Sequence, residues 1–367
     1  MKGKTSLRYL IFYATSRCNL RCDHCFYTNE LQTRDELSLA EIRRVARSVC
    51  PLEFVRVTGG EPFLRFDLPL VIEAFVREAG VCRMGIITNG SLPDIVTSSV
   101  HEIFQRCPSL DLDVGVSVDG LCETHDRLRN QRGIFNKCRA TVENLLGLKD
   151  IFPELQVSLV VTVSSANVKE LDELFDELTG WGVDRISPNL VRGIARESYV
   201  SPVKFDEYER FALKCEAHHL SRSGSARSMV QRAKNRLTRE AIRDVLADRP
   251  SPIACVAASR IGVLYSDGVV SVCEPLFHQA SSGDQECEID PILGNVRDVG
   301  CDLSQVWESE KANEARRWIK HSDCSCTHEC FLTASILWGP RQYPRLLRET
   351  FKESLTGAPS STDQADG

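Results

Sequence analysis

The chain lacks the features of a membrane protein or of a nucleic-acid binder. No stretch approaches the roughly 20 consecutive apolar residues of a membrane-spanning helix. Residues 1–8 are basic and polar, and the apolar run after them is too short for a secretory signal peptide. Positive charge is not in excess, since 51 acidic and 45 basic side chains give a net charge of −6. We therefore expect a cytoplasmic protein with no nucleic-acid and no membrane partner.

Cysteine, by contrast, is abundant, with 16 residues in a chain of 367. In a reducing compartment, grouped cysteines serve metals or catalysis more often than disulfides. Cys18, Cys22 and Cys25 have the spacing C-x3-C-x2-C. Three thiolates at this spacing can hold three irons of a cubic [4Fe–4S] cluster and leave the fourth iron without a protein ligand. An open iron is a place to bind and reduce a molecule, so the spacing indicates chemistry rather than electron storage alone.

Short β-rich runs alternate with helical patterns through the first half of the chain. The expected strands are Tyr9–Ala14, Phe54–Thr58, Arg83–Thr88, Asp113–Val118, Gln156–Val163 and Arg185–Asn189. Six successive βα units predict a parallel sheet with helices outside it. An open, partial (βα)6 barrel and a doubly wound sheet both fit this pattern.

Two helix starts have the pattern of a capping box. The first, Ser38 to Glu41, predicts a helix to about Val49, and the second, Asn167 to Glu170, predicts a helix to Thr179. Further along, residues 203–246 are mostly helical in pattern, with an expected loop at the Ser/Gly-rich residues 221–225.

From Pro250 the pattern becomes β-rich again. An Asp-Gly pair lies between the runs Ile261–Tyr265 and Val269–Cys273, which predicts a β-hairpin. The last residues, 356–367, are small and polar and predict disorder.

Further motifs follow the expected strands. They are Gly59-Gly60-Glu61 after the second strand, Thr88-Asn89-Gly90 after the third, Ser117-Val118-Asp119 at the fourth and Asn189 at the sixth. Loops at the carboxyl ends of parallel strands build active sites, so these motifs and the cysteine loop should share one rim. The glycines allow a ligand to approach the backbone closely. Glu61 suits an ammonium group or a loop-supporting role, and Asp119 suits ribose hydroxyls or a turn cap.

These residues resemble the radical S-adenosylmethionine (SAM) superfamily. The resemblance rests on the three-cysteine motif and on Gly59-Gly60-Glu61-Pro62. The stretch 117–135, with Asp119-Gly120, His125-Asp126 and Gly133-Ile134-Phe135, is similar to members that carry a C-terminal SPASM or twitch cluster domain. The resemblance covers residues 7–335.

The resemblance implies that SAM and a [4Fe–4S] cluster are cofactors. Cys18, Cys22 and Cys25 would hold the cluster, whose open iron receives the amino and carboxylate groups of SAM. One electron from an external donor such as flavodoxin or ferredoxin would then cleave SAM to methionine and a 5′-deoxyadenosyl radical, which abstracts hydrogen from the substrate.

The resemblance also assigns roles around SAM. Gly59, Gly60 and Glu61 would meet the amino end of its methionine, Ser117 and Asp119 its other polar groups, Asn189 its adenine, and Tyr27 would flank the adenine or pack.

A second set of cysteines lies near the expected hairpin. Cys255 precedes it and Cys273 ends it, so a hairpin can bring the two thiols together. The spacing C-x12-G-x4-C matches the start of the SPASM/twitch signature, whereas the later C-x-C-x3-C of Cys324, Cys326 and Cys330 departs from the familiar C-x2-C-x5-C-x3-C.

One auxiliary [4Fe–4S] cluster takes at most four of these five thiolates. We favour Cys255, Cys273, Cys326 and Cys330, with Cys324 as the competitor. A zinc site of Cys324, Cys326, His328 and Cys330 is the alternative. Cys287 and Cys301 are interpreted as loop cysteines, although they leave room for a second auxiliary cluster. Six further cysteines are interpreted as packing residues: Cys50, Cys82, Cys107, Cys122, Cys138 and Cys215.

The predicted function is that of a radical SAM oxidoreductase or maturase acting on a peptide or protein, with the auxiliary cluster taking up an electron. The first alternative is dehydrogenation or epimerisation of a small sugar, an aminocyclitol or another metabolite. The second is a non-catalytic iron–sulfur electron carrier, which would have no need of Gly59-Gly60-Glu61 and Asp119. Only a short segment precedes the first strand, so we expect no fused leader-binding domain there. No catalytic base is identifiable beyond Glu274, the candidate beside Cys273.

The expected fold class is α/β with an added α+β part. A partial (βα)6 TIM-like barrel (1–200) precedes a helical linker (201–250), a small α+β auxiliary-cluster domain with a β-hairpin (251–340), and a C-terminal helix with a disordered tail (341–367).

Overall fold

The computed structural model describes residues 6–28, 31–32, 35–221, 226–282 and 288–356. Its strands are β1 Tyr9–Thr15, β2 Phe54–Gly59, β3 Arg83–Thr88, β4 Asp111–Ser117, β5 Leu155–Val163, β6 Arg185–Leu190, β7 Ile261–Leu264, β8 Val269–Ser271 and β9 Ile292–Asn295. Its α-helices are α1 Leu39–Ser48, α2 Leu68–Ala79, α3 Pro93–Arg106, α4 Cys122–Leu128, α5 Ile134–Lys149, α6 Leu171–Thr179, α7 Phe205–Ser221, α8 Ala226–Leu246, α9 Glu274–Ser282, α10 Leu303–Trp307, α11 Glu310–His321, α12 Glu329–Trp338 and α13 Tyr343–Thr356.

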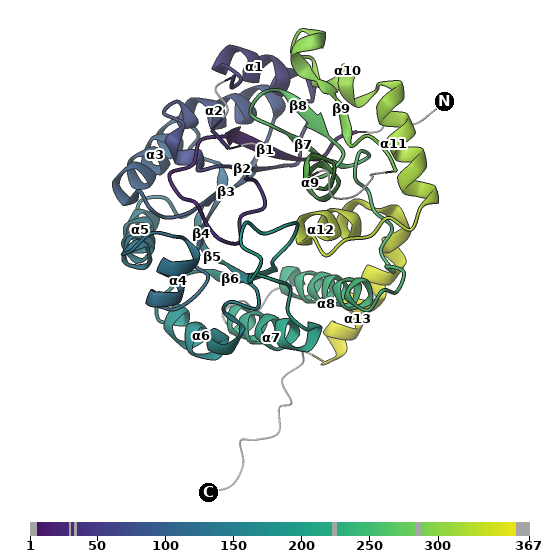
Figure 1. Cartoon of the computed structure of the whole chain (residues 1–367). Helices are drawn as coiled ribbons and strands as arrows, with labels where there is room; N and C mark the ends of the chain where they lie inside the picture. The colour runs from purple at the N-terminus through teal and green to yellow at the C-terminus, as the bar shows by residue number, and fades with distance from the viewer. Residues whose placement is uncertain (1–5, 29–30, 33–34, 222–225, 283–287, 357–367) are drawn as a thin grey trace, which may run out of the picture.

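A nine-stranded sheet runs through the described chain in the order β6-β5-β4-β3-β2-β1-β7-β8-β9. Strands β1 to β6 pair in parallel, each with its neighbour in sequence. Because the order never reverses, the connecting helices lie on one side and form the outer ring visible in Figure 1. The arrangement is therefore a partial (βα)6 barrel, since a doubly wound sheet would reverse its strand order. The six expected strands are confirmed, with small differences at their ends.

The predicted hairpin is confirmed, and it continues the barrel sheet. Strand β7 pairs in parallel with β1, with Ile261 opposite Tyr9, and β8 returns antiparallel to β7. Gly268 has φ +92° in the turn, a conformation that glycine adopts without strain. The second cysteine set is thus attached to the same sheet as the first.

Helix α12 spans the open side of the partial barrel. At its start, Oε1 of Glu329 accepts a hydrogen bond from the amide of Leu190 at the end of β6, at 2.9 Å. At its end, Nε1 of Trp338 donates to Oε2 of Glu53, just before β2, at 2.7 Å. Helix α8 packs against both α12 and α13, as Figure 1 shows at the lower right.

One of the two predicted capping boxes is present. Oγ of Ser38 accepts from the amide of Glu41, whose carboxylate accepts from the amide of Ser38 at 2.8 Å. The second prediction was wrong, because Asn167 caps no helix and α6 begins only after a 3₁₀ turn. Oδ1 of Asn167, the atom that would accept in a cap, instead accepts from the amide of Ser164 at 2.9 Å, and its Nδ2 donates to the backbone carbonyl of Asp119 at 2.6 Å. The helix itself ends at Thr179, as predicted.

None of the described helices is long and apolar enough to cross a bilayer. Most of the loop expected at 221–225 and the tail 357–367 lie outside the described residues.

Candidate functional site

The loop with Cys18, Cys22 and Cys25 begins where β1 ends, at the carboxyl rim of the barrel. The carboxylate of Glu36 fixes its start by accepting from the amide of Ser16 at 3.0 Å. Further along, the amide of Cys25 donates to the carbonyl of Cys22 at 3.2 Å, which closes a tight turn. The thiols therefore lie on one short, braced loop.

The three thiols are close enough to affect one another. Burial, together with the neighbouring sulfur of Cys22, raises the pKa of Cys18 to about 11 and that of Cys25 to about 12. Burial likewise raises the pKa of Cys22. Thiolates crowded in a buried place are unfavourable unless cations bind them, and iron does so with loss of the thiol protons. The donor set therefore fits a three-cysteine [4Fe–4S] cluster.

Gly59 and Gly60 lie directly against this loop. The amide of Gly60 donates to the carbonyl of Thr15 at 2.9 Å, and the amide of Glu61 donates to that of Arg17 at 2.7 Å. A Cβ on either glycine would overlap a carbonyl oxygen of the cysteine loop, and Gly59 has φ +140°. The close backbone approach is thus made between two loops, while contact of the glycines with SAM stays a prediction.

Glu61 braces the rim from inside. Its side chain is buried and accepts from Oγ1 of Thr88 at 2.8 Å, from the amide of Asn89 at 2.7 Å and from the amide of Phe63 at 3.2 Å. Burial raises its pKa to about 7, although these donors favour the ionised form. Asn89 in turn donates to Oδ1 of Asn19 in the cysteine loop at 3.0 Å. This geometry matches the loop-supporting role.

Asp119 lies at the rim after β4 but is fully buried, with both oxygens engaged. Oδ1 accepts from the amide of Thr162 at 2.8 Å, and Oδ2 accepts from Nε of Arg129 at 2.7 Å and pairs with its Nη2 at 2.5 Å. Burial opposes the ionised form, yet the charge of Arg129 outweighs it and lowers the pKa of Asp119 to about 2. The carboxylate thus holds Arg129 rather than facing open space for a ribose.

Sequence reasoning missed Arg129 altogether. Its Nη1 lies 3.8 Å from Sγ of Cys22. The sequence did contain a signal for Arg129, because Arg129 follows His125 by one helical turn and so lies on the same helix face. The ring of His125 accepts a hydrogen bond from the amide of Asp119 at 3.0 Å.

The remaining predicted SAM residues differ in their surroundings. Ser117 ends β4 and is buried, and Asn189 is half-buried in β6 opposite Thr162. Tyr27 is buried and packs, with its ring 4.7 Å from that of Tyr13 and stacked on Tyr265 at 6.0 Å. Of the two roles expected for Tyr27, the structure shows packing.

Four cysteines from three segments line a second cavity of about 110 Å³: Cys255, Cys273, Cys324 and Cys326. Apolar side chains such as Val272, Phe331 and Leu332 complete much of its wall. Burial raises the pKa of Cys255 and of Cys326 to about 12, and the neighbouring thiols add to the effect. The donor set fits a cluster with four thiolate ligands.

Cys330 does not line this cavity. Burial opposes its thiolate, but the hydrogen bond and charge of His328 and the charge of Arg56 outweigh it and lower the pKa of Cys330 to about 7. Because Arg56 lies in β2 and Tyr9 also interacts with this thiol, Cys330 faces the barrel. Cys324, the competitor in the sequence-based prediction, therefore lines the four-cysteine cavity, where Cys330 was expected.

The zinc alternative lacks a free histidine. Nε2 of His328 contacts the carboxylate of Glu274, and Nδ1 accepts from the amide of Cys330 at 3.3 Å. The other oxygen of Glu274 accepts from the Tyr13 hydroxyl. Burial opposes the Glu274 carboxylate, yet His328 and Arg192 outweigh it and lower the pKa of Glu274 to about 2. Glu274 is thus a buried link between β1 and the segment before α12.

A sequence model of the radical SAM superfamily matches residues 12–178, which contain all three cysteines of the first loop. Over these residues the chain is similar to the radical SAM superfamily. Fe-coproporphyrin III synthase of Methanosarcina barkeri is 32% identical over 182 residues, which are 48% of this chain and 42% of that protein. The subtilosin biosynthesis protein AlbA of Bacillus subtilis is 24% identical over 211 residues, 56% of this chain and 45% of AlbA. The chain thus spans less than half the length of either relative.

Solved structures share the fold of this chain. SuiB of Streptococcus suis bound to S-adenosylmethionine has a TM-score of 0.59 at 16% identity, over 85% of this chain and 68% of SuiB. The enzyme anSMEcpe with bound AdoMet has a TM-score of 0.58 at 17% identity, over 98% of this chain and 96% of that one. At these identities the likeness is one of fold.

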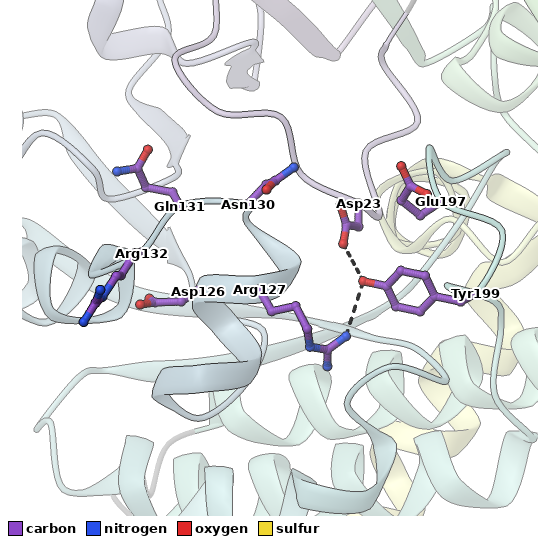
Figure 2. A pocket seen from close by; sticks show the side chains of 8 residues that line it. All are labelled: Asp23, Asp126, Arg127, Asn130, Gln131, Arg132, Glu197 and Tyr199. Carbon is purple, nitrogen blue, oxygen red and sulfur yellow. Dashed lines mark hydrogen bonds between the residues drawn. The ribbon is translucent and has the colours of Figure 1, made fainter.

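A surface hollow of about 490 Å³ lies beside the radical SAM cysteine loop, with Asp23, which follows Cys22, in its wall (Figure 2). The Tyr199 hydroxyl contacts Asp23 and accepts from Nη1 of Arg127 at 3.3 Å. The amide of Asp23 also donates to the carbonyl of Leu128 at 2.8 Å. These contacts tie Cys22 to the end of α4.

The other cysteines differ partly from expectation. Cys107, Cys138 and Cys215 are buried, whereas the packing role predicted for Cys50, Cys82 and Cys122 was wrong because these three are exposed. Cys301 is buried beside Arg44, and Cys287 lies outside the described residues.

Proposed function

We propose that this chain is a radical SAM enzyme that abstracts hydrogen from a peptide or protein substrate and passes one electron of the substrate to an auxiliary cluster. The observation that carries the proposal is the pairing of a three-cysteine loop at the rim with a four-cysteine cavity on the same sheet. When bound, the first cluster supplies the electron that cleaves SAM, and the resulting 5′-deoxyadenosyl radical removes the hydrogen atom.

The chain's own residues divide the work at the rim. Cys18, Cys22 and Cys25 would hold the first cluster, and Cys18 and Cys25 are the half-buried members of the set. SAM would be bound by residues that end or follow strands: Gly59, Gly60, Glu61, Ser117 and Asn189. Asp119 acts through Arg129, because both of its oxygens are engaged. Tyr27 forms part of the packed wall behind the loop.

Cys255, Cys273, Cys324 and Cys326 hold one auxiliary [4Fe–4S] cluster. Four thiolates leave no open iron, so this cluster takes up an electron and does not bind substrate. The apolar lining of the cavity keeps water from the cluster, which protects it and tunes its potential. A reducing, cytoplasmic setting and a flavodoxin or ferredoxin donor suit such thiolate-held clusters.

Several relatives support a peptide substrate by their names. SuiB has been solved bound to precursor peptide SuiA, and anSMEcpe with a Cp18Cys peptide. AlbA is named for the biosynthesis of a bacteriocin. A small metabolite is the second candidate, because Fe-coproporphyrin III synthase and the GTP 3′,8-cyclase of Haemophilus ducreyi, 34% identical over 118 residues, are named for small molecules.

The test of the enzyme is formation of 5′-deoxyadenosine. The protein is purified without oxygen, its iron is counted, and dithionite and SAM are added. We expect 5′-deoxyadenosine from the wild type and from Cys50→Ala, which removes an exposed cysteine, and none from Cys22→Ala. Iron near eight per chain fits two cubic clusters, roughly four irons each. A wild type that is full of iron but forms no 5′-deoxyadenosine would leave the non-catalytic electron carrier as the better function.

The substrate class is decided by isotope transfer. Candidate peptides and candidate metabolites with carbon-bound deuterium are incubated separately with the enzyme and SAM. Deuterium in 5′-deoxyadenosine from a peptide supports the proposal, and deuterium only from a metabolite replaces it with the small-molecule alternative.

A further inference from the structure

The guanidinium of Arg129 lies behind the first cysteine loop. Nη1 is 3.8 Å from Sγ of Cys22, within hydrogen-bond distance for sulfur. Arg129 is 7% exposed and Cys22 is 8% exposed, so little water lies between or around them. An arginine side chain keeps its charge in proteins, so this is a permanent positive charge beside the thiol.

The position of Arg129 is fixed by Asp119. Nε and Nη2 both bind Oδ2 of Asp119, and Oδ1 of Asp119 accepts from the amide of Thr162. His125 and Asn167 hold the backbone of Asp119 from two sides. Arg129 can therefore not swing away from Cys22 without breaking a buried, two-pronged ion pair.

A charge in this place acts on a bound cluster through one of its ligands. Reduction adds one electron and makes the cluster more negative, so a donor and a positive charge at a ligand sulfur favour the reduced form. The effect is strong where water is excluded. Asp119 acts in the opposite direction, because its negative charge offsets part of that of Arg129.

We propose that Arg129, held by Asp119, raises the reduction potential of the SAM-binding cluster through Cys22, which makes Arg129 a positioning residue for electron entry. The inference rests on the proposed cluster at Cys18, Cys22 and Cys25. The proposal gives the Arg129–Asp119 ion pair a role beyond stabilising the fold. For stability alone, an uncharged pair of side chains would fill the same space.

The test is a redox titration followed by electron paramagnetic resonance, with dithionite as the electron source. The first cluster is recognised as the signal that changes when SAM is added. We expect Arg129→Gln to lower the equilibrium constant for one-electron reduction at least tenfold, which is about 59 mV. Arg129→Lys should lower it less, because the charge remains while the fork geometry is lost. The control Arg132→Gln removes an exposed arginine of the same loop region and should leave the potential unchanged.

Asp119→Asn makes the decisive comparison. It leaves the charge of Arg129 without its partner, so the potential should rise, whereas structural damage would move both variants in the same direction. Shifts of the same sign in Arg129→Gln and Asp119→Asn, or no shift in either, would overturn the inference. If Arg129→Gln does not fold, the double variant Asp119→Asn/Arg129→Gln, which buries no unpaired charge, is titrated in its place and compared with Asp119→Asn. Its potential should lie below that of Asp119→Asn, and an equal or higher potential would overturn the inference.

The outcome is separable from that of the proposed function. A wild type without a SAM-sensitive cluster signal contradicts the proposed cofactor. A wild type with that signal, whose potential is the same in Arg129→Gln and Arg132→Gln, contradicts only the role of Arg129.

Discussion

Glu61 and Asn89 join the ends of β2 and β3, because the amide of Asn89 donates to Oε2 of Glu61 at 2.7 Å. Glu61 also reaches the cysteine loop through its own amide, which donates to the carbonyl of Arg17. One buried residue therefore links three rim loops, two through its carboxylate and the third through its backbone amide. Its chemistry gives a measurable signature, since its pKa lies far from that of a free glutamate.

Stability of the metal-free chain should fall as pH rises through the range in which Glu61 titrates. Burial raises the pKa of Glu61 to about 7, whereas an unfolded glutamate ionises near 4.3. Between these values the folded chain keeps a proton that the unfolded chain has lost, so the free energy of unfolding falls by about 3 kcal/mol as pH rises from about 4.5 to 7. Urea unfolding at a series of pH values measures this. Glu61→Gln should lack this component of the slope, and an equal slope in both proteins would contradict the assignment.

Gly60→Ala should damage the cysteine loop. Its Cβ would overlap the carbonyl of Arg17, so the loop must move, and forced overpacking costs about 1–3 kcal/mol. We expect the chain to lose that much stability and to bind fewer irons after anaerobic reconstitution. The matched control is Gly147→Ala in α5, where a Cβ meets nothing within 4 Å and alanine favours the helix by about 0.5–1 kcal/mol. Full iron in Gly60→Ala would show that the loop tolerates the methyl group.

The sequence predicted well what depends on neighbours in the chain. The strands, the Ser38 capping box and the Asp-Gly hairpin follow from periodicity and turn chemistry, and all three are in the structure. The shared rim followed from parallel strands, because their carboxyl ends meet at one edge.

What failed depended on contacts between distant segments. Asn167 has the pattern of a helix cap, but the carbonyl of Asp119 holds its Nδ2 while its Oδ1 accepts from the amide of Ser164. The sequence favoured Cys330 over Cys324, and only the fold turns Cys324 toward Cys255 and Cys330 toward the barrel. Arg129 was missed because only the fold brings its guanidinium to Cys22, 107 residues away in the sequence.

Glu274→Gln should destabilise the protein, but it should not remove a catalytic base. The Glu274 carboxylate binds Tyr13 and His328, and breaking a buried pair costs about 3–5 kcal/mol. Burial opposes its charge, but these partners and Arg192 outweigh it and lower its pKa to about 2, so it is a poor proton acceptor at neutral pH. Its contribution to stability is present above about pH 4.5 and is lost as pH falls toward 2.

Urea unfolding measures the loss of stability, and Glu314→Gln, at an exposed glutamate of α11, is the matched control. Formation of 5′-deoxyadenosine by folded Glu274→Gln should keep the pH profile of the wild type. A lost basic or acidic limb in that profile would instead make Glu274 the proton acceptor.

Cys324→Ser and Cys330→Ser should differ in the iron they hold, because only Cys324 lies on the four-cysteine cavity. Removal of one of four thiolates should destroy or weaken the auxiliary cluster, with a loss approaching about four irons per chain in Cys324→Ser. Cys330→Ser changes a thiol that faces Tyr9 and Arg56, so its iron count should equal that of the exposed-cysteine control Cys50→Ser. The three variants are reconstituted together without oxygen, and iron, sulfide and the visible spectrum are measured for each. Full iron in Cys324→Ser with a loss in Cys330→Ser would reinstate the ligand set that the sequence favoured. It would require the first turn of α12, which contains Cys330, to rearrange when the cluster binds.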